Sequence, residues 1–229
     1  MIRDNIVTIE QNIASICKRL NRNPQEIAIV GVTKYGDASK IKEAVEAGVK
    51  HIGENRVQDA LEKFPVLDGL KVKVTKHLIG HLQANKAKYA VQLFDMIQSV
   101  DSFKLAQEID RQASKNNRVM NILAQINTSG EAQKFGAEKS DGLALVEQAA
   151  ALKNLRILGL MTIGPMTEDK SVVRQCFRDL RAIYDEISKK FSGSEKIKMQ
   201  YLSMGMTDDY EIALEEGSNM VRIGRAIFK

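Results

Sequence analysis

Apolar positions along the chain follow two recurring patterns, one typical of amphipathic helices and the other of buried strands. Residues 6–20 place Ile6, Ile9, Ile13 and Ile16 on one face of a helix. Residues 27–34, IAIVGVTK, form a short β-branched segment typical of a strand buried on both faces. The alternation continues to the end of the sequence. It predicts further strands over residues 51–55, 77–80, 96–100, 119–128, 155–164, 200–205 and 219–228, and helices over 38–48, 56–64, 84–94, 102–115, 141–152, 171–191 and 208–217.

Eight predicted strands therefore alternate with seven helices, preceded by an extra helix at the N-terminus. This alternation predicts right-handed βαβ units and a parallel sheet. Eight such units are the number that closes a (β/α)8 TIM barrel. We expect no helix after the eighth strand and expect the N-terminal helix to fill that gap. A doubly wound open sheet is the alternative. No Pro-, Gly- or Ser-rich linker divides the sequence, so residues 1–229 are predicted to form a single α/β domain.

Composition narrows the class of protein further. Hydrophobic residues make up 44% and charged residues 28% of the chain, as in ordinary globular proteins, and no apolar run is long enough to span a membrane. The N-terminal residues do not resemble a secretory signal, and Cys17 and Cys176 are expected to be buried thiols in a reducing cytoplasm. The net charge of +5 is spread without a basic block, which favours a solvated surface, with an anionic small ligand as the next interpretation.

Lys34 ends the first predicted strand, at the carboxyl end where TIM barrels carry their chemistry. Residues two apart share one strand face, so Lys34 is expected to point into the barrel with Ala28, Val30 and Val32. A partly desolvated amine there would be a usable nucleophile towards an aldehyde. The alternative is a surface lysine just beyond the strand.

Two glycine-containing loops follow the seventh and eighth predicted strands, where this fold usually binds phosphate. In LSMGMTDDYE, Ser203 offers a hydroxyl, Gly205 allows close backbone approach, and either aspartate of the DD pair can cap the next helix. In RIGRAIF, Gly224 and Arg225 offer backbone N–H groups, and Arg225 adds a charge. The alternative is that both glycines are ordinary turn residues.

Arg222 lies two residues before Gly224, on the same face of the last strand. A permanent charge that points into a barrel must meet an anion or a polar acceptor, and a structural salt bridge is the alternative. A lysine, two phosphate loops and an arginine at one mouth suggest pyridoxal 5'-phosphate, with its aldehyde on Lys34 and its pyridine nitrogen at Arg222. A guanidinium only donates hydrogen bonds, so it would keep that nitrogen neutral and disfavour carbanion chemistry.

A metal site is not predicted. His77 and His81 are four residues apart, which would suit zinc on a helix, but HLIG has the pattern of a strand. No nearby carboxylate or third histidine completes a ligand set.

Several strings resemble the pyridoxal phosphate homeostasis protein family, in order and in register from about residue 27 to residue 228: VTKYGDASKI, HIGENRVQDALEKF, HLIGHLQANK, NTSGEAQKFG, GLMTIGP and LSMGMTDDYEIALEEGSNMVRIGRAIF. That family is similar to the N-terminal barrel of alanine racemase, a fold type III pyridoxal enzyme. The resemblance implies a Schiff base on Lys34 and an arginine at the ring nitrogen. The cofactor-binding positions that it implies are Lys34, Asn55, His77, Met161, Ser203, Gly205, Arg222, Gly224 and Arg225. Many members have a small hydroxyl residue where this chain has Arg225.

The resemblance implies a protein of intracellular pyridoxal phosphate homeostasis that stores, buffers or delivers the cofactor. Racemases move a proton between two faces and need an acid or base on each, but Lys34 is the only evident candidate here. Their second domain is not expected after the eighth strand. We therefore predict a cytoplasmic, monomeric binding protein with no catalytic residue, no nucleic-acid or membrane partner, and apoenzymes that need the cofactor as candidate recipients. The alternatives are a weak amino-acid racemase, a Schiff-base aldolase, and a nucleic-acid binder motivated only by the pI of 9.1.

Overall fold

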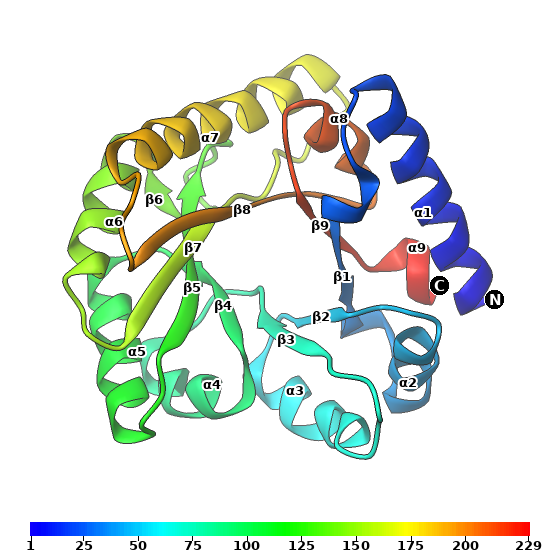
Figure 1. Cartoon of the computed structure of the whole chain (residues 1–229), viewed down its shortest axis with the longest axis horizontal. Helices are drawn as coiled ribbons and strands as arrows, with labels where there is room; N and C mark the ends of the chain where they lie inside the picture. The colour runs from blue at the N-terminus through cyan, green and yellow to red at the C-terminus, as the bar shows by residue number, and fades with distance from the viewer.

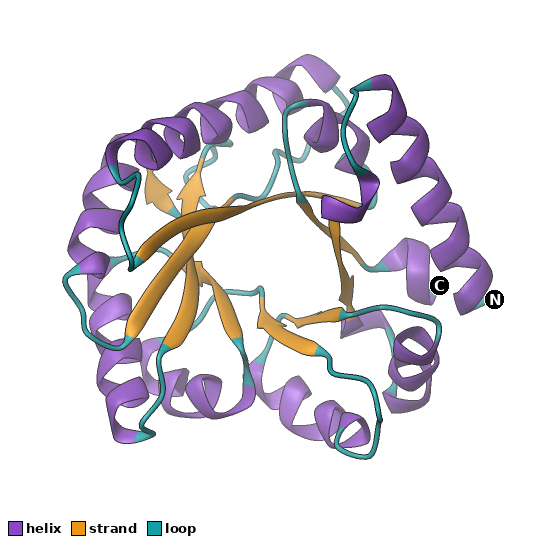
Figure 2. Cartoon of the chain, in the orientation of Figure 1, coloured by secondary structure: helices purple, strands orange, loops and turns teal.

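A closed ring of parallel strands, surrounded by helices, forms the centre of the molecule (Figures 1 and 2). The computed structural model describes residues 1–229. The barrel strands are β1 (Ala28–Val32), β2 (His51–Glu54), β3 (Thr75–Leu78), β4 (Met96–Val100), β5 (Met120–Asn127), β7 (Leu155–Met161), β8 (Ile197–Met206) and β9 (Met220–Ile223). A two-residue strand that the sequence pattern did not predict, β6 (Ala137–Glu138), pairs with the end of β5.

The strand order shows how the ring closes. Neighbours follow the order β4-β3-β2-β1-β9-β8-β7-β5, and β4 also pairs with β5. The pairings are parallel, and Val30 of β1 aligns with His51 of β2 on one side and Arg222 of β9 on the other. The predicted (β/α)8 barrel is therefore confirmed, and the open doubly wound sheet is wrong.

The helices cover the outside of the ring. They are α1 (Ile2–Arg19), α2 (Ala38–Glu46), α3 (Val57–Lys63), α4 (Ala87–Leu93), α5 (Phe103–Lys115), α6 (Gly142–Ala150), α7 (Lys170–Lys190), α8 (Tyr210–Glu215) and α9 (Arg225–Phe228). Helix α1 contacts α2, α8 and α9, and both termini lie beside one another (Figure 1). The Asn5 side-chain amide donates to the carbonyl oxygen of Ile227 at 3.0 Å. The N-terminal helix thus occupies the gap after the eighth strand, as predicted.

The end of the chain corrects one detail of the prediction. The last strand, expected over residues 219–228, ends at Ile223, and a one-turn helix follows where none was expected. Gly224 ends the strand because its carbonyl oxygen accepts from the N–H groups of Ile227 and Phe228 at 3.0 and 3.1 Å. The bonds of a helical turn therefore replace strand pairing at this point.

Apolar side chains form an outer core and an inner core. The outer core lies between strands and helices and includes the fully buried rings of Phe64, Phe94 and Phe177. The inner cluster comes from β1, β4, β5, β7 and β9 and consists of Val30, Met96, Leu123, Leu158, Met161 and Met220. Both cysteines are buried, as predicted. None of the helices has the length and apolar character that crossing a membrane requires.

Candidate functional site

Lys34 lies directly after β1, at the carboxyl end of the barrel. Strand β1 ends at Val32, and Thr33–Tyr35 form a 3₁₀ turn, so the two-residue alternation that predicted an inward-pointing lysine stops before Lys34. The Lys34 side chain is exposed, and its Nζ lies 4.9 Å from the centre of the Tyr35 ring. Lys229 Nζ lies 4.7 Å from the centre of the same ring. The expected desolvation is wrong for this structure, which presents Lys34 as an accessible amine.

Arg222 and Ser203 meet inside the barrel. Arg222 Nη1 donates to Ser203 Oγ at 2.8 Å, and Nη2 donates to the carbonyl oxygen of Thr162 at 2.7 Å. Arg222 is only 3% exposed, and burial lowers its pKa to about 10, although the Asp209 carboxylate acts in the opposite direction. Both hydrogen-bond partners are neutral, so the salt bridge considered as an alternative for Arg222 is not what holds it.

Ser203 begins a chain of hydrogen bonds that crosses the barrel interior. Its Oγ donates to Gln98 Oε1 at 2.7 Å, Gln98 Nε2 lies 3.0 Å from His77 Nδ1, and His77 Nε2 lies 3.0 Å from His51 Nδ1. The Gln98 amide is oriented with Oε1 towards Ser203 and Nε2 towards His77, so Nε2 donates to Nδ1 of the His77 ring. The network therefore assigns His77 as neutral with its proton on Nε2. Burial, with a smaller effect of His51, lowers the pKa of His77 to about 3.

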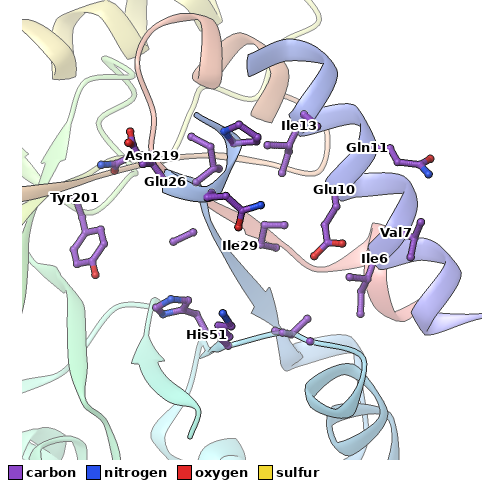
Figure 3. Close-up of a pocket in the computed structure, with 18 of the residues that line it drawn as sticks. Ile6, Val7, Glu10, Gln11, Ile13, Glu26, Ile29, His51, Tyr201 and Asn219 are labelled. Carbon is purple, nitrogen blue, oxygen red and sulfur yellow. The ribbon is translucent and has the colours of Figure 1, made fainter. Parts of the chain in front are cut away.

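The chain of hydrogen bonds reaches a cavity at the opposite end of the barrel. This cavity of about 800 Å³ lies beside α1, at the amino ends of β1, β2 and β9. His51, Tyr201 and Asn219 line its barrel side, and Glu10 lines the side formed by α1 (Figure 3). TIM barrels carry their chemistry at the carboxyl ends of the strands, so this cavity is separate from the mouth at Lys34.

Packing explains both glycines that were predicted to lie in loops, although Gly205 lies within β8, one residue before its end, and only Gly224 follows its strand. Gly205 has a φ of +93°, and a Cβ there would lie 2.5 Å from the Cβ of Ala213 in α8. A Cβ on Gly224 would lie 3.3 Å from Cδ2 of Tyr35. The second contact shows that the turn bearing Lys34 and the loop after β9 are neighbours. The phosphate role of both loops stays a prediction.

The charged residues of these loops bind each other. Arg225 Nη2 donates to Asp208 Oδ2 in an exposed ion pair, which engages the side chain whose phosphate contact was predicted. Asp209 Oδ1 accepts from the Met206 N–H at 2.5 Å and makes no cap on α8, so the predicted helix cap is wrong. Burial raises the pKa of Asp209, while the Met206 N–H and the charge of Arg222 oppose that shift.

The other predicted positions lie at different depths. Asn55 follows β2 and is half-buried, whereas Met161 and His77 are buried completely. The structure thus joins Arg222, Ser203 and His77 through one interior chain of hydrogen bonds and leaves Lys34 and Asn55 at the mouth.

Similar proteins agree with this architecture. Residues 5–229 match the family model of the alanine racemase N-terminal domain. The pyridoxal phosphate homeostasis protein of Aquifex aeolicus is 38% identical over 95% of this chain and 93% of its own. The chain belongs to the pyridoxal phosphate homeostasis protein family. The family resemblance predicted from the sequence is confirmed.

Solved structures related to the family have the same barrel. PipY of Synechococcus elongatus PCC7942, in a structure with PLP bound, has a TM-score of 0.85 and 31% identity, and each chain is covered completely. The alanine racemase of Clostridium difficile has a TM-score of 0.73 at 16% identity, over 99% of this chain and 55% of its own, which is a likeness of fold alone.

Three residues that contact the predicted site residues or their neighbours were not identified from the sequence. Gln98 links Ser203 to His77, and the fully buried Glu54 pairs with the half-buried Lys63 next to Thr33, the residue before Lys34. The available signal was a polar residue inside an otherwise apolar strand, as in MIQSV and HIGEN, because such residues are buried only with a partner. Their partners were not visible, because those residues lie on other elements.

Proposed function

We propose that this chain binds pyridoxal 5'-phosphate as a Schiff base on Lys34 and serves intracellular homeostasis of that cofactor by storing, buffering or delivering it. Membership of the family supports this function, as does the PipY structure with PLP bound. We further propose that it acts without strong catalytic turnover. Apoenzymes that need the cofactor are the proposed recipients, and a cytoplasmic monomer is the proposed form.

The residues at the mouth suit this cofactor. The observation that carries the proposal is an accessible amine, Lys34, at the same barrel end as a buried cation, Arg222, whose hydrogen-bond partners are neutral. When bound, the cofactor supplies an aldehyde, which condenses with a lysine amine with loss of one water, and a phosphate anion. The contact between Tyr35 and Gly224 places the amine-bearing turn beside the proposed phosphate loop.

Each residue would have a separate role. Lys34 would hold the aldehyde carbon, and the backbone of Ser203–Gly205, near the end of β8, and of Gly224–Arg225, after β9, would hold the phosphate. The Ser203 hydroxyl already binds Gln98 and Arg222, so we assign it the role of orienting Arg222. Arg222 only donates hydrogen bonds, so it would keep a neighbouring ring nitrogen unprotonated and limit carbanion chemistry.

An absorption titration tests the proposal. Purified wild type, Lys34→Ala and Lys42→Ala are each titrated with pyridoxal phosphate; Lys42 is an exposed lysine of α2 and serves as the matched control. We expect a visible imine band in the wild type and in Lys42→Ala, and none in Lys34→Ala. A racemisation assay with L- and D-alanine then tests the alternative, which Lys34-dependent turnover would support. A wild type that stays colourless in excess cofactor would contradict the proposal.

A further inference from the structure

A fully buried carboxylate lies directly beneath the turn that carries Lys34. Glu54 is the last residue of β2 and has no exposed surface. Its Oε1 accepts from the Thr33 hydroxyl and from Lys63 Nζ, both at 2.7 Å, and its Oε2 accepts from the Asn55 N–H at 3.1 Å. A buried carboxylate is tolerated only with such partners. The 3₁₀ turn after β1, the end of β2 and the end of α3 therefore meet at this one side chain.

Thr33, the residue before Lys34, is held through both its side chain and its backbone. Its hydroxyl lies 2.7 Å from Glu54 Oε1 and 3.1 Å from the carbonyl oxygen of Gly53. Its own carbonyl oxygen accepts from Lys63 Nζ at 2.9 Å and from the Gly36 N–H at 3.0 Å. Backbone motion on the N-terminal side of Lys34 would break these bonds. The ion pair therefore fixes the backbone position from which the Lys34 side chain extends.

Asn55, the other predicted cofactor neighbour at the mouth, is held by the same carboxylate. Its N–H donates to Glu54 Oε2, and its carbonyl oxygen packs so closely on Gly80 that a Cβ there would lie 2.2 Å away. Glu54 therefore determines the relative position of two adjacent strand ends, the one that bears Lys34 and the one that bears Asn55.

We propose that Glu54, Thr33 and Lys63 form a positioning clasp that sets the reactivity of Lys34 towards the cofactor aldehyde. This inference rests on the proposed function. None of the three would touch the cofactor; they act through the Lys34 backbone. A misplaced amine slows and weakens covalent capture but leaves phosphate recognition intact, because the proposed phosphate-binding residues lie at the carboxyl ends of β8 and β9.

Two ligands separate positioning from general stabilisation. Pyridoxal phosphate can form the imine, whereas pyridoxine 5'-phosphate has an alcohol in place of the aldehyde and binds without a covalent bond. For Glu54→Gln we expect the Kd for pyridoxal phosphate to rise about tenfold or more, with slower growth of the imine band. The Kd for pyridoxine 5'-phosphate should change less than about twofold. Lys63→Met should behave like Glu54→Gln, and Lys63→Arg should restore covalent capture.

Glu216→Gln is the matched control, because Glu216 is also largely buried and pairs with Arg174 and Arg178 away from the mouth. It should leave both affinities unchanged. If Glu54→Gln does not fold, Thr33→Val with Thr33→Ser as its rescue repeats the test. An equal rise in the Kd for both ligands, or no change in either Kd, would overturn the clasp while leaving the proposed function intact. A wild type that binds pyridoxine 5'-phosphate but forms no imine would instead overturn the proposed covalent function, and the clasp with it.

Discussion

At the scale of single residues, one permanent cation organises the barrel interior. Arg222 donates to Ser203, whose hydroxyl begins a chain of hydrogen bonds that runs through Gln98 and His77 to His51. Gln98 Oε1 accepts from Ser203, and Gln98 Nε2 donates to His77 Nδ1, so the proton of the His77 ring lies on Nε2 and faces His51 Nδ1. The interior therefore has one preferred proton arrangement, in which both histidines are neutral.

Gln98 is the residue on which this arrangement depends most. Gln98→Leu leaves His77 Nδ1 without its donor and Ser203 Oγ without its acceptor in a buried site. We expect the free energy of unfolding to fall by about 1–3 kcal/mol, measured by urea denaturation. The control is Gln175→Leu on the exposed face of α7, which should change it by less than about 0.5 kcal/mol. Equal effects of the two substitutions would contradict the chain as described.

Protonation of His77 links stability to pH. The pKa of His77 is about 3 in the folded protein, whereas an unperturbed histidine titrates near 6.5. Below pH 6.5 this histidine binds a proton in the unfolded chain, whereas His77 stays neutral in the folded protein. The contribution of His77 to the free energy of unfolding is therefore fully present above this pH. Stability falls as the pH drops towards 3, by up to about 1.4 kcal/mol per pH unit. The lowered pKa of His51 acts in the same direction.

Urea unfolding at pH 7.5 and pH 5 measures this dependence. His77→Gln keeps a polar side chain of related size and removes the titrating ring, so its unfolding free energy should change less between the two pH values than that of the wild type. A variant with the full wild-type dependence would show that other groups cause it.

At the scale of elements, the carboxyl end of β8 depends on its close approach to α8. Gly205→Ala and Gly193→Ala both place a Cβ on a left-handed backbone, with φ values of +93° and +87°, but only the Cβ at residue 205 meets other atoms. Gly193→Ala should cost about 1–2 kcal/mol from its backbone alone. Gly205→Ala should cost about 1–3 kcal/mol more, because it also pushes α8 away. Thermal unfolding of both variants tests the difference, and equal losses would contradict the steric argument.

The order of elements was predictable because buried parallel strands and amphipathic helices leave different apolar periodicities. The positions of the site residues were less predictable. The turn at Thr33–Tyr35 depends on Glu54 and Lys63, and the partner of Gln98, Ser203, lies 105 residues away in the sequence. Local patterns therefore identified Lys34, Ser203 and Arg222 as candidates. They did not reveal the exposed turn that carries Lys34 or the linking residues Gln98, Glu54 and Lys63.

At the scale of the whole molecule, α1 completes the outer layer where β9 has only a one-turn helix behind it. Ile9 on its inner face is 5% exposed, whereas Val7 on the same helix is 43% exposed. Ile9→Ala should lower the free energy of unfolding by about 2–5 kcal/mol. Val7→Ala should change it by less than about 0.5 kcal/mol. If chemical denaturation gave equally small losses of unfolding free energy for both variants, α1 would not unfold cooperatively with the core.

The central claim, covalent binding of pyridoxal phosphate at Lys34, has a direct test at the level of the peptide. The wild type is mixed with pyridoxal phosphate, reduced with borohydride, digested and mapped by mass spectrometry. We expect the phosphopyridoxyl mass on Lys34 at near-stoichiometric yield, and its loss in Lys34→Ala. A label spread over surface lysines, or one centred on another residue such as Lys229, would contradict the account.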